Sequence, residues 1–123
     1  MHIADVAHYV RPGTPLDEDA RARGTSVYFP ERAIHMFPEP LATGVCSLVE
    51  GADRLVQSCL MDVDGRGVVQ RCEFHDGVIC SRARLTYTEV DAILTTRDPE
   101  ARARRQALVP MLEDMRDLFA VLR

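Results

Sequence analysis

The sequence predicts an α+β fold that combines an antiparallel β-meander with short helices and a long amphipathic C-terminal helix. Two observations predict the meander: runs rich in β-branched residues, and the Asp-Gly turn signals between them. An apolar stripe with helical spacing near the C-terminus predicts the long helix. Because 46% of the 123 residues are hydrophobic, the chain can bury a core, and we take residues 1–123 as one domain.

The N-terminal part of the chain is expected to hold one strand and one helix. Residues 3–10 (IADVAHYV) are rich in β-branched side chains and stop at an Arg-Pro-Gly turn signal, so they predict a strand. Residues 16–23 predict a short helix, because the acidic residues come first and the arginines last, as the helix dipole prefers. Gly24 is the expected stop of this helix.

Prolines interrupt the segment that follows. Residues 21–38 (RARGTSVYFPERAIHMFP) contain two Phe-Pro pairs and are expected to be largely extended. Residues 39–48 predict one helical turn followed by a loop. A tyrosine within so irregular a stretch is unusual, because core aromatic residues commonly sit in regular strands or helices.

The β-meander is expected in the middle of the chain. Residues 54–63 and 67–75 flank Asp64-Gly65-Arg66, and the Asp-Gly pair is typical of a hairpin turn. A second pair, Asp76-Gly77, predicts another turn, and residues 78–85 then predict a third strand.

The C-terminal third is expected to be helical. Thr86 and Glu89 form a capping box that starts a short helix ending near Leu94. Asp98 is the expected N-cap of a second, long helix, which Pro110 should kink. The apolar stripe of this helix follows 3-4 spacing. It comprises Leu108, Met111, Leu112, Met115, Leu118, Phe119 and Leu122.

Charge and composition restrict the possible functions. The net charge is −4, which argues against strong non-specific binding of nucleic-acid phosphates by the whole chain. All 15 basic residues are arginine, and we attribute this to a GC-rich genome rather than to phosphate recognition. The sequence contains no run of 18 apolar residues, so no membrane span is predicted. The cysteines are interpreted as small buried hydrophobic residues in a reducing cytosol, so a cytoplasmic location is expected.

Local motifs indicate neither a catalytic centre nor a metal site. The four cysteines and four histidines lack the spacing of zinc ligands. Residues 61–67 (MDVDGRG) are interpreted as a hairpin turn rather than a calcium loop, because the third acid and the distal glutamate are missing. The acids at 17–19 are interpreted as charges of a helix start, since consecutive helix positions point to different faces.

Tyr28 and Tyr87 are the candidate binding residues. One interpretation is structural: each ring is half-buried and its hydroxyl group is satisfied within the fold. The other is functional: each ring offers a stacking face to a base and a hydroxyl group to a ribose. Tyr87 is also expected at the first position of a capped helix, where free backbone amides attract anions.

Several blocks of the sequence resemble a known enzyme family. The stretch from IADVAHYV through SVYFPER to CSL is similar to the catalytic (RNB) domain of the ribonuclease II and ribonuclease R exoribonucleases. RARLTYTEVDAIL and LVPMLEDMRDLFAVLR resemble the parts that follow, so the resemblance covers nearly the whole chain. The SVYFPER block is more similar to the ribonuclease R side of the family.

The resemblance implies processive hydrolysis of single-stranded RNA from its 3′ end, with magnesium as cofactor and nucleoside 5′-monophosphates as products. It also implies that Tyr28 stacks on the 3′-terminal base and that Tyr87 contributes to ribose recognition. The family's metal-binding aspartates precede the IADV block, and none of the aspartates in this chain matches them. We therefore expect residues 1–123 to form part of an RNB catalytic domain that supplies a wall of the substrate cavity, with neither catalytic nor metal-binding residues.

Three hypotheses follow. In the first, the chain is an internal piece of an exoribonuclease and is inactive when isolated. In the second, it is a truncated, non-catalytic paralogue that binds RNA, or binds a protein through the apolar stripe of the C-terminal helix. In the third, it is an unrelated small α+β domain whose tyrosines belong to the core.

Overall fold

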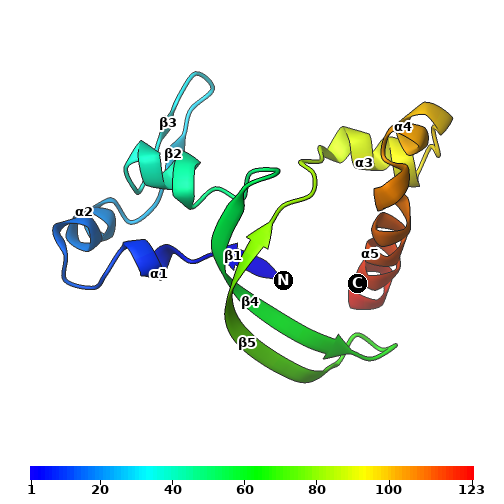
Figure 1. Cartoon of the computed structure of the whole chain (residues 1–123), viewed down its shortest axis with the longest axis horizontal. Coiled ribbons are helices and arrows are strands. Elements are labelled where there is room, and N and C mark those ends of the chain that lie inside the picture. The colour runs from blue at the N-terminus through cyan, green and yellow to red at the C-terminus, as the bar shows by residue number, and fades with distance from the viewer. The chain divides into compact units, whose positions relative to one another are not determined.

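The computed structural model describes residues 1–123 and contains two compact units (Figure 1). The first unit comprises Met1–Leu60 and Glu73–Arg82, and the second comprises Met61–Cys72 and Ala83–Arg123. Helices and antiparallel strands are both present, which confirms the predicted α+β class.

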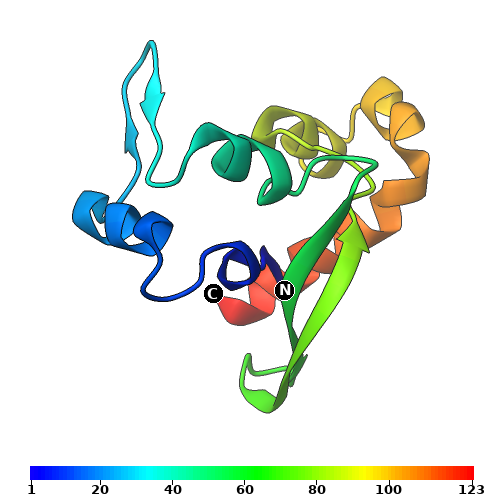
Figure 2. The same ribbon diagram turned by 60° about the vertical axis from the view of Figure 1, so that its left-hand side comes forward.

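A three-stranded sheet joins a strand near the N-terminus to two long strands from the middle of the chain. Its strands are β1 (His2–Ala4), β4 (Asp53–Val63) and β5 (Val69–Cys80), in the order β1-β4-β5. β1 pairs antiparallel with β4, with Ile3 opposite Gln57. Figure 2 shows β4 and β5 as one long hairpin. β4 also contributes the buried side chains of Val56 and Cys59, and Ala20 of α2 is the other buried hydrophobic residue of the first unit.

The strand expected over residues 3–10 is wrong in its second half. β1 ends at Ala4, and α1 (Val6–Tyr9) follows it. The reason is local, because Oδ1 of Asp5 accepts a hydrogen bond of 3.0 Å from the backbone N–H of His8. This side-chain cap satisfies an orphan amide of the short helix and favours it over a continued strand.

The prediction of a turn at Asp76-Gly77 is also wrong. β5 continues through both residues, and no separate third strand covers residues 78–85. The turn preferred for Asp-Gly needs positive φ at both central residues, and Gly77 does not have it. The long strand β4 offers β5 a pairing partner along its length, and this tertiary pairing overrides the local turn signal.

The other hairpin turn is confirmed at residues 64–68. The Asp64 carboxylate accepts hydrogen bonds from the backbone N–H groups of Arg66, at 2.8 Å, and Val68, at 3.1 Å. The residue with positive φ is Gly67, at 79°, rather than Gly65. The Asp64 side chain therefore organises the turn, and Gly67 provides the left-handed backbone conformation that other residues disfavour.

The helix of the N-terminal half is confirmed as α2 (Pro15–Arg23). Thr14 caps its first turn, and Gly24, with φ of 72°, ends it. The chain then forms β2 (Val27–Tyr28) and β3 (Ala33–Ile34), which pair antiparallel in a two-stranded sheet. A short helical segment, η1 (Pro40–Val45), matches the helical turn expected before the sheet.

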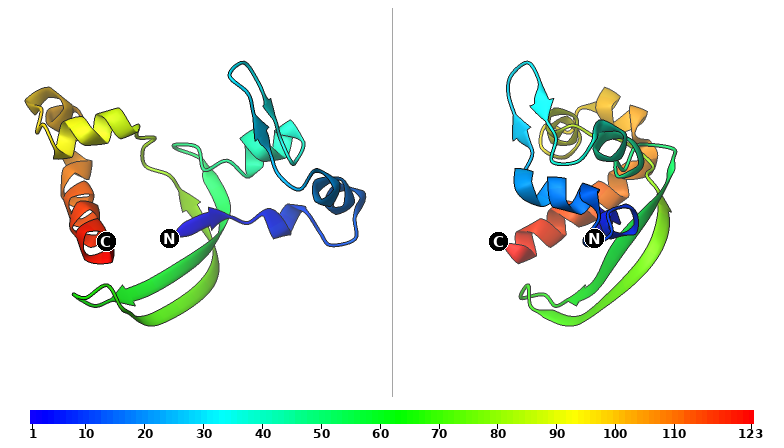
Figure 3. Two further views of the ribbon diagram at one scale, coloured as in Figure 1. Left: turned by 180° about the vertical axis from the view of Figure 1, so that it is seen from behind. Right: turned by 90° about the vertical axis from the view of Figure 1, so that its left-hand side faces the viewer.

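The C-terminal helices lie in the second unit and are seen from two further sides in Figure 3. α3 (Tyr87–Leu94) has Thr86 as its N-cap, and α4 (Pro99–Arg104) has Asp98, so both caps are confirmed. The single kinked helix expected from Asp98 is wrong. A 3-10 turn (η2, Gln106–Leu108) separates α4 from α5 (Val109–Leu122). Pro110 lies in the first turn of α5, where it starts a helix instead of kinking one.

The core of the second unit consists of four buried side chains, from Ile93, Ala101, Val109 and Leu112. Only the start of the apolar stripe on α5 joins this core. The exposed part of the stripe comprises Met111, Met115, Leu118, Phe119 and Leu122. No helix is long and apolar enough to cross a membrane. The interpretation of all four cysteines as buried is wrong, because Cys72 and Cys80 are exposed and Cys46 is half-buried.

Candidate nucleic-acid interface

Tyr28 lies on a two-stranded arm, which we define as β2, β3 and the loop between them. The register places Tyr28 opposite Ala33. The backbone N–H of Phe29 donates a hydrogen bond of 2.8 Å to the carbonyl oxygen of Arg32, which closes the loop. In Figure 2 the arm, drawn in cyan, extends away from α2. Pro30 lies in the loop of this small hairpin and Pro38 follows its second strand, and the hairpin carries the tyrosine outside the core.

Aromatic and cationic side chains gather on the arm. The Tyr28 side chain is 75% exposed and packs edge-to-face against His35, with ring centroids 6.4 Å apart and an angle of 83° between the ring planes. Cζ of Arg32 lies 5.9 Å from the centroid of the Phe29 ring, at the outer limit of a cation–π contact. Aromatic faces next to a guanidinium group are the combination that single-stranded nucleic acids stack on.

Tyr87 is the first residue of α3 and is 98% exposed. The hydroxyl oxygen of Thr86 accepts a hydrogen bond of 3.2 Å from the backbone N–H of Glu89 and thereby fixes the start of the helix. The cap therefore fixes the backbone position of Tyr87 at the start of α3. Because Tyr28 and Tyr87 are both exposed, the interpretation of them as half-buried or core residues is wrong. Their assignment to RNA binding stays a prediction.

An ion pair between Glu89 and Arg105 stabilises the first turn of α3. Nε of Arg105 donates a hydrogen bond of 2.8 Å to Oε1 of Glu89. This bond is the main reason why the pKa of the Glu89 carboxyl lies below its ordinary value, and the backbone N–H of Thr86 lowers it further. The pair ties the first turn of α3 to the residue that follows α4.

Two further carboxylates, those of Asp17 and Asp64, are engaged in local structure. The backbone N–H of Gly13 donates to Asp17 at 2.9 Å and lowers the pKa of that carboxyl. The N–H groups of Val68 and Arg66 do the same for Asp64. No three histidine, cysteine or acidic side chains gather in a group that could hold a metal ion. The residues present therefore do not fit the magnesium site that the resemblance implies, and we derive no chemical step through magnesium.

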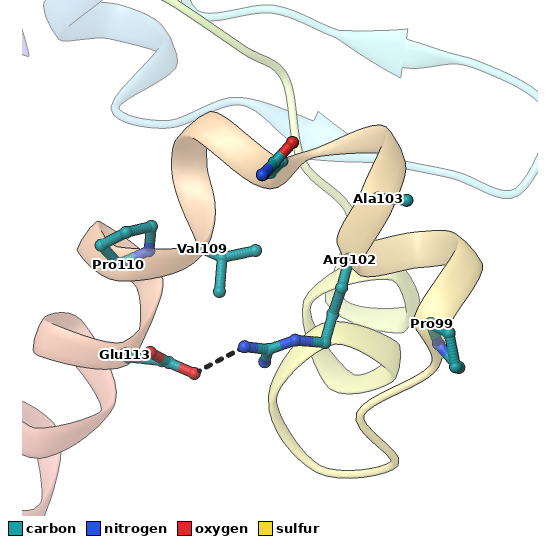
Figure 4. Close-up of a pocket in the computed structure, with 7 residues that line it drawn as sticks. Pro99, Arg102, Ala103, Val109, Pro110 and Glu113 are labelled. Atoms are coloured by element: carbon teal, nitrogen blue, oxygen red, sulfur yellow. Dashed lines mark hydrogen bonds and ion pairs between the residues drawn. The ribbon is translucent and has the colours of Figure 1, made fainter.

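An open pocket of about 550 Å³ lies beside α4 and α5 (Figure 4). It is lined by Pro99, Arg102, Ala103, Gln106, Val109, Pro110 and Glu113. The Arg102 guanidinium donates to Glu113 at 3.0 Å and to the carbonyl oxygen of Ile93 at 3.0 Å. These bonds join the three helices, so the charged groups of the pocket serve the packing of the unit and we assign the pocket no ligand.

Comparison with known proteins identifies the family. The family model of the RNB domain matches residues 1–123. The chain belongs to the RNB domain family. It is 49% identical over 120 residues to ribonuclease R of Escherichia coli (strain K12), an alignment that covers 98% of this chain and 15% of that protein. The RNB chain thus spans about 15% of the length of this curated relative. The predicted resemblance is confirmed, and the hypothesis of an unrelated α+β domain is wrong.

Solved structures show the same fold. The apo form of Mycoplasma genitalium RNase R matches with a TM-score of 0.74 and 29% identity, over 92% of this chain and 18% of that chain. The complex of the same protein with double-stranded RNA matches with a TM-score of 0.74 and 32% identity, over 79% of this chain and 17% of that chain. Yeast Ssd1, described as a pseudonuclease, shares the fold at a TM-score of 0.66 and 22% identity, over 77% of this chain and 12% of that chain.

The sequence analysis named both tyrosines as candidate binding residues but not His35, the aromatic neighbour of Tyr28. The signal that could have found it is the short separation of two aromatic rings across a tight hairpin. Detecting it requires the register of β2 against β3, and strands of two residues each give too little periodicity to fix that register.

Proposed function

We propose that this chain is part of the catalytic domain of a processive 3′-to-5′ exoribonuclease that hydrolyses single-stranded RNA to nucleoside 5′-monophosphates. Membership of the RNB domain family and 49% identity to a ribonuclease R support this proposal. Solved structures of Mycoplasma genitalium RNase R, a structural neighbour, show that protein in complex with double-stranded RNA and with ribose-methylated single-stranded RNA. The observation that carries the proposal is the exposure of Tyr28 and Tyr87 on elements fixed by local hydrogen bonds.

Each tyrosine has a distinct role in this proposal. The Tyr28 ring stacks on the 3′-terminal base, since an aromatic face accepts any base and therefore suits a processive enzyme. The Tyr87 hydroxyl contacts the terminal ribose, where a 2′-OH group distinguishes RNA from DNA. Neither residue carries out bond cleavage. This chain binds and orients the RNA end as a wall of the substrate cavity.

Bond cleavage depends on groups outside this chain in our proposal. The magnesium ions of the family require carboxylate ligands, and the acids described here are committed to turns and ion pairs. We therefore expect the isolated chain of 123 residues to be inactive. Magnesium-dependent release of nucleotides from labelled poly(A) by the purified chain would contradict this. The cytoplasmic location expected from the sequence stays part of the proposal.

The test replaces each tyrosine with alanine in the full-length protein. Base stacking on an aromatic side chain contributes about 1–3 kcal/mol, so Tyr28→Ala should raise KM for a short single-stranded RNA by about 5- to 150-fold. Tyr87→Ala should reduce the preference for RNA over a DNA-ended oligonucleotide. Both side chains are exposed, so the Tm should not change.

Phe74→Ala is the matched control, because Phe74 is an aromatic residue of β5 that is 78% exposed. It should leave KM unchanged. Unchanged trimming of short RNA by both tyrosine variants would overturn the proposed roles. A full-length protein that degrades no RNA at all would overturn the exoribonuclease itself.

A second candidate is a non-catalytic binding module that contacts a protein through the exposed stripe of α5. Large apolar side chains such as Met115 and Phe119 are exposed there. The likeness to a protein described as a pseudonuclease shows the fold alone, and a fold does not determine catalysis. This candidate makes two predictions. The full-length protein should degrade no RNA, and Phe119→Glu should abolish its binding to a protein partner.

A further inference from the structure

The Tyr28 ring has one aromatic neighbour, His35, and the hairpin register brings the two together. Tyr28 is opposite Ala33, so His35 is two residues further along and occupies the diagonal position across the arm. Diagonal pairs are within reach of aromatic side chains. The centroid separation of 6.4 Å and the interplanar angle of 83° agree with the edge-to-face arrangement that aromatic rings prefer.

The backbone around His35 is fixed, whereas the Tyr28 side chain is exposed. The hydroxyl oxygen of Ser26 accepts a hydrogen bond of 2.8 Å from the backbone N–H of Met36, the residue that follows His35. The guanidinium group of Arg23, at the end of α2, donates to the carbonyl oxygen of His35 at 3.5 Å. Both bonds attach the base of the arm to the segment that leads into it. His35 is half-buried there, whereas Tyr28 is 75% exposed.

An exposed tyrosine that stacks on a base must lose side-chain freedom when the base binds, and this loss weakens binding. A neighbouring ring that already restricts the tyrosine reduces that cost. We propose that His35 is a positioning residue, which holds the Tyr28 ring in the orientation that receives the 3′-terminal base. This inference rests on the proposed function of Tyr28, and it assigns no contact between His35 and RNA.

The test measures RNA binding by the full-length protein in EDTA, so that binding is followed without cleavage. The probe is a short single-stranded RNA with 2-aminopurine as its 3′-terminal base, whose fluorescence is quenched by stacking. His35→Ala should weaken binding about two- to tenfold, the range expected for one edge-to-face contact, and should reduce the quenching at saturation. His35→Phe keeps an aromatic ring at the same position and should restore both.

The chain contains a matched control pair. His8 packs edge-to-face against Tyr9, with centroids 5.0 Å apart and an interplanar angle of 78°, on α1 rather than on the arm. His8→Ala removes an equivalent ring contact and should change neither affinity nor quenching. An equal loss of affinity in His8→Ala and His35→Ala would mean that the effect is general destabilisation, and would overturn the inference.

A double-mutant cycle separates the inference from the function on which it rests. If His35 acts through Tyr28, then His35→Ala should have no further effect in the Tyr28→Ala background. Full additivity of the two changes would overturn the positioning role. Weaker binding in Tyr28→Ala with normal binding and quenching in His35→Ala would overturn the inference and leave the proposed function intact. Normal binding in Tyr28→Ala would overturn the proposed role of Tyr28, on which the inference rests.

Discussion

Arg105 and Glu89 join two helices of the second unit through a hydrogen bond of 2.8 Å between Nε and Oε1. Arg105 follows the last turn of α4, and Glu89 lies in the first turn of α3. The carboxylate that completes the capping box at Thr86 is therefore also the acceptor of a tertiary ion pair. A negative charge at this end of α3 is favoured by the helix dipole as well. Three influences thus hold Glu89 in its charged form.

This arrangement predicts a pH dependence of stability. The pKa of Glu89 is lowered from its ordinary value of 4.5, mainly by the Arg105 hydrogen bond. The folded state therefore holds a proton at this site less readily than the unfolded state does, so the contribution of Glu89 is fully present above about pH 4.5. It is lost as the pH falls through the lowered pKa of the folded state. Glu89→Gln should lower the Tm of the protein at pH 7, and this difference should shrink as the pH falls below 4.5 and through the lowered pKa of the folded state.

The control for this prediction is Glu100→Gln. Glu100 also pairs with an arginine, Arg104, at 3.2 Å, but both side chains of that pair are largely exposed. Exposed pairs contribute little to stability. Equal Tm changes at pH 7 in the Glu89 and Glu100 variants would contradict a special role for the Arg105 contact.

The tip of the long hairpin makes a second prediction. Gly67 has φ of 79°, and a Cβ atom there would lie 2.7 Å from the backbone carbonyl oxygen of Val121 near the end of α5. Gly67→Ala combines backbone strain of about 1–2 kcal/mol with a clash that a movement of the hairpin tip or of the end of α5 must relieve. Hydrogen exchange in the hairpin and at the end of α5 should become faster in this variant.

Two other glycines separate strain from clash. Gly51 has φ of 75° but nothing within 4 Å of an added Cβ, so Gly51→Ala should show the strain alone. Gly65 has open space around it and no positive φ, so Gly65→Ala should be close to neutral. If Gly67→Ala were no more destabilising than Gly51→Ala, the clash with Val121 would contribute nothing to the loss of stability.

The core of the second unit makes a third prediction. Ile93 is 0% exposed and packs with Ala101, Val109 and Leu112. Ile93→Ala removes buried methyl and methylene groups and leaves a cavity, so it should destabilise the unit by about 2–5 kcal/mol. Hydrogen exchange of the α3 amides measures the free energy of opening for this unit inside the full-length protein.

Leu118→Ala is the matched aliphatic control. The Leu118 side chain lies on α5 and is 45% exposed, so its truncation should change the opening free energy by clearly less than truncation of the fully buried Ile93 does. A cost for Leu118→Ala equal to that for Ile93→Ala would show that the exposed stripe of α5 is covered in the full-length protein.

Much of the local structure could be predicted because its causes lie within a few residues of sequence. Thr86 and Asp98 cap helices through their own side chains, and Gly24 ends one by adopting a positive φ. The turn at Asp64 is likewise built by its own carboxylate. Among the candidate site residues, Tyr28 and Tyr87 were identified from their local context, and both are exposed as a binding role requires.

Where the sequence-based prediction is wrong, long-range contacts or a competing local cap decide the structure. Asp76-Gly77 carries the pattern of a turn, yet β5 passes through it because β4 provides a continuous pairing partner. Residues 6–9 carry the pattern of a strand, yet Asp5 caps them as a helix. In the first case, a long-range backbone pairing outweighs the local turn preference of Asp-Gly.

The sequence alone determined the family, the α+β class and the helix caps, because each rests on residue identities at fixed spacing. Only the tertiary structure decided that Tyr28 is paired with His35 and that the α5 stripe is mostly exposed. The physical reason is the same in both cases. A strand register and the covered face of a helix depend on which distant segment packs against them, and spacing along one chain does not specify that partner.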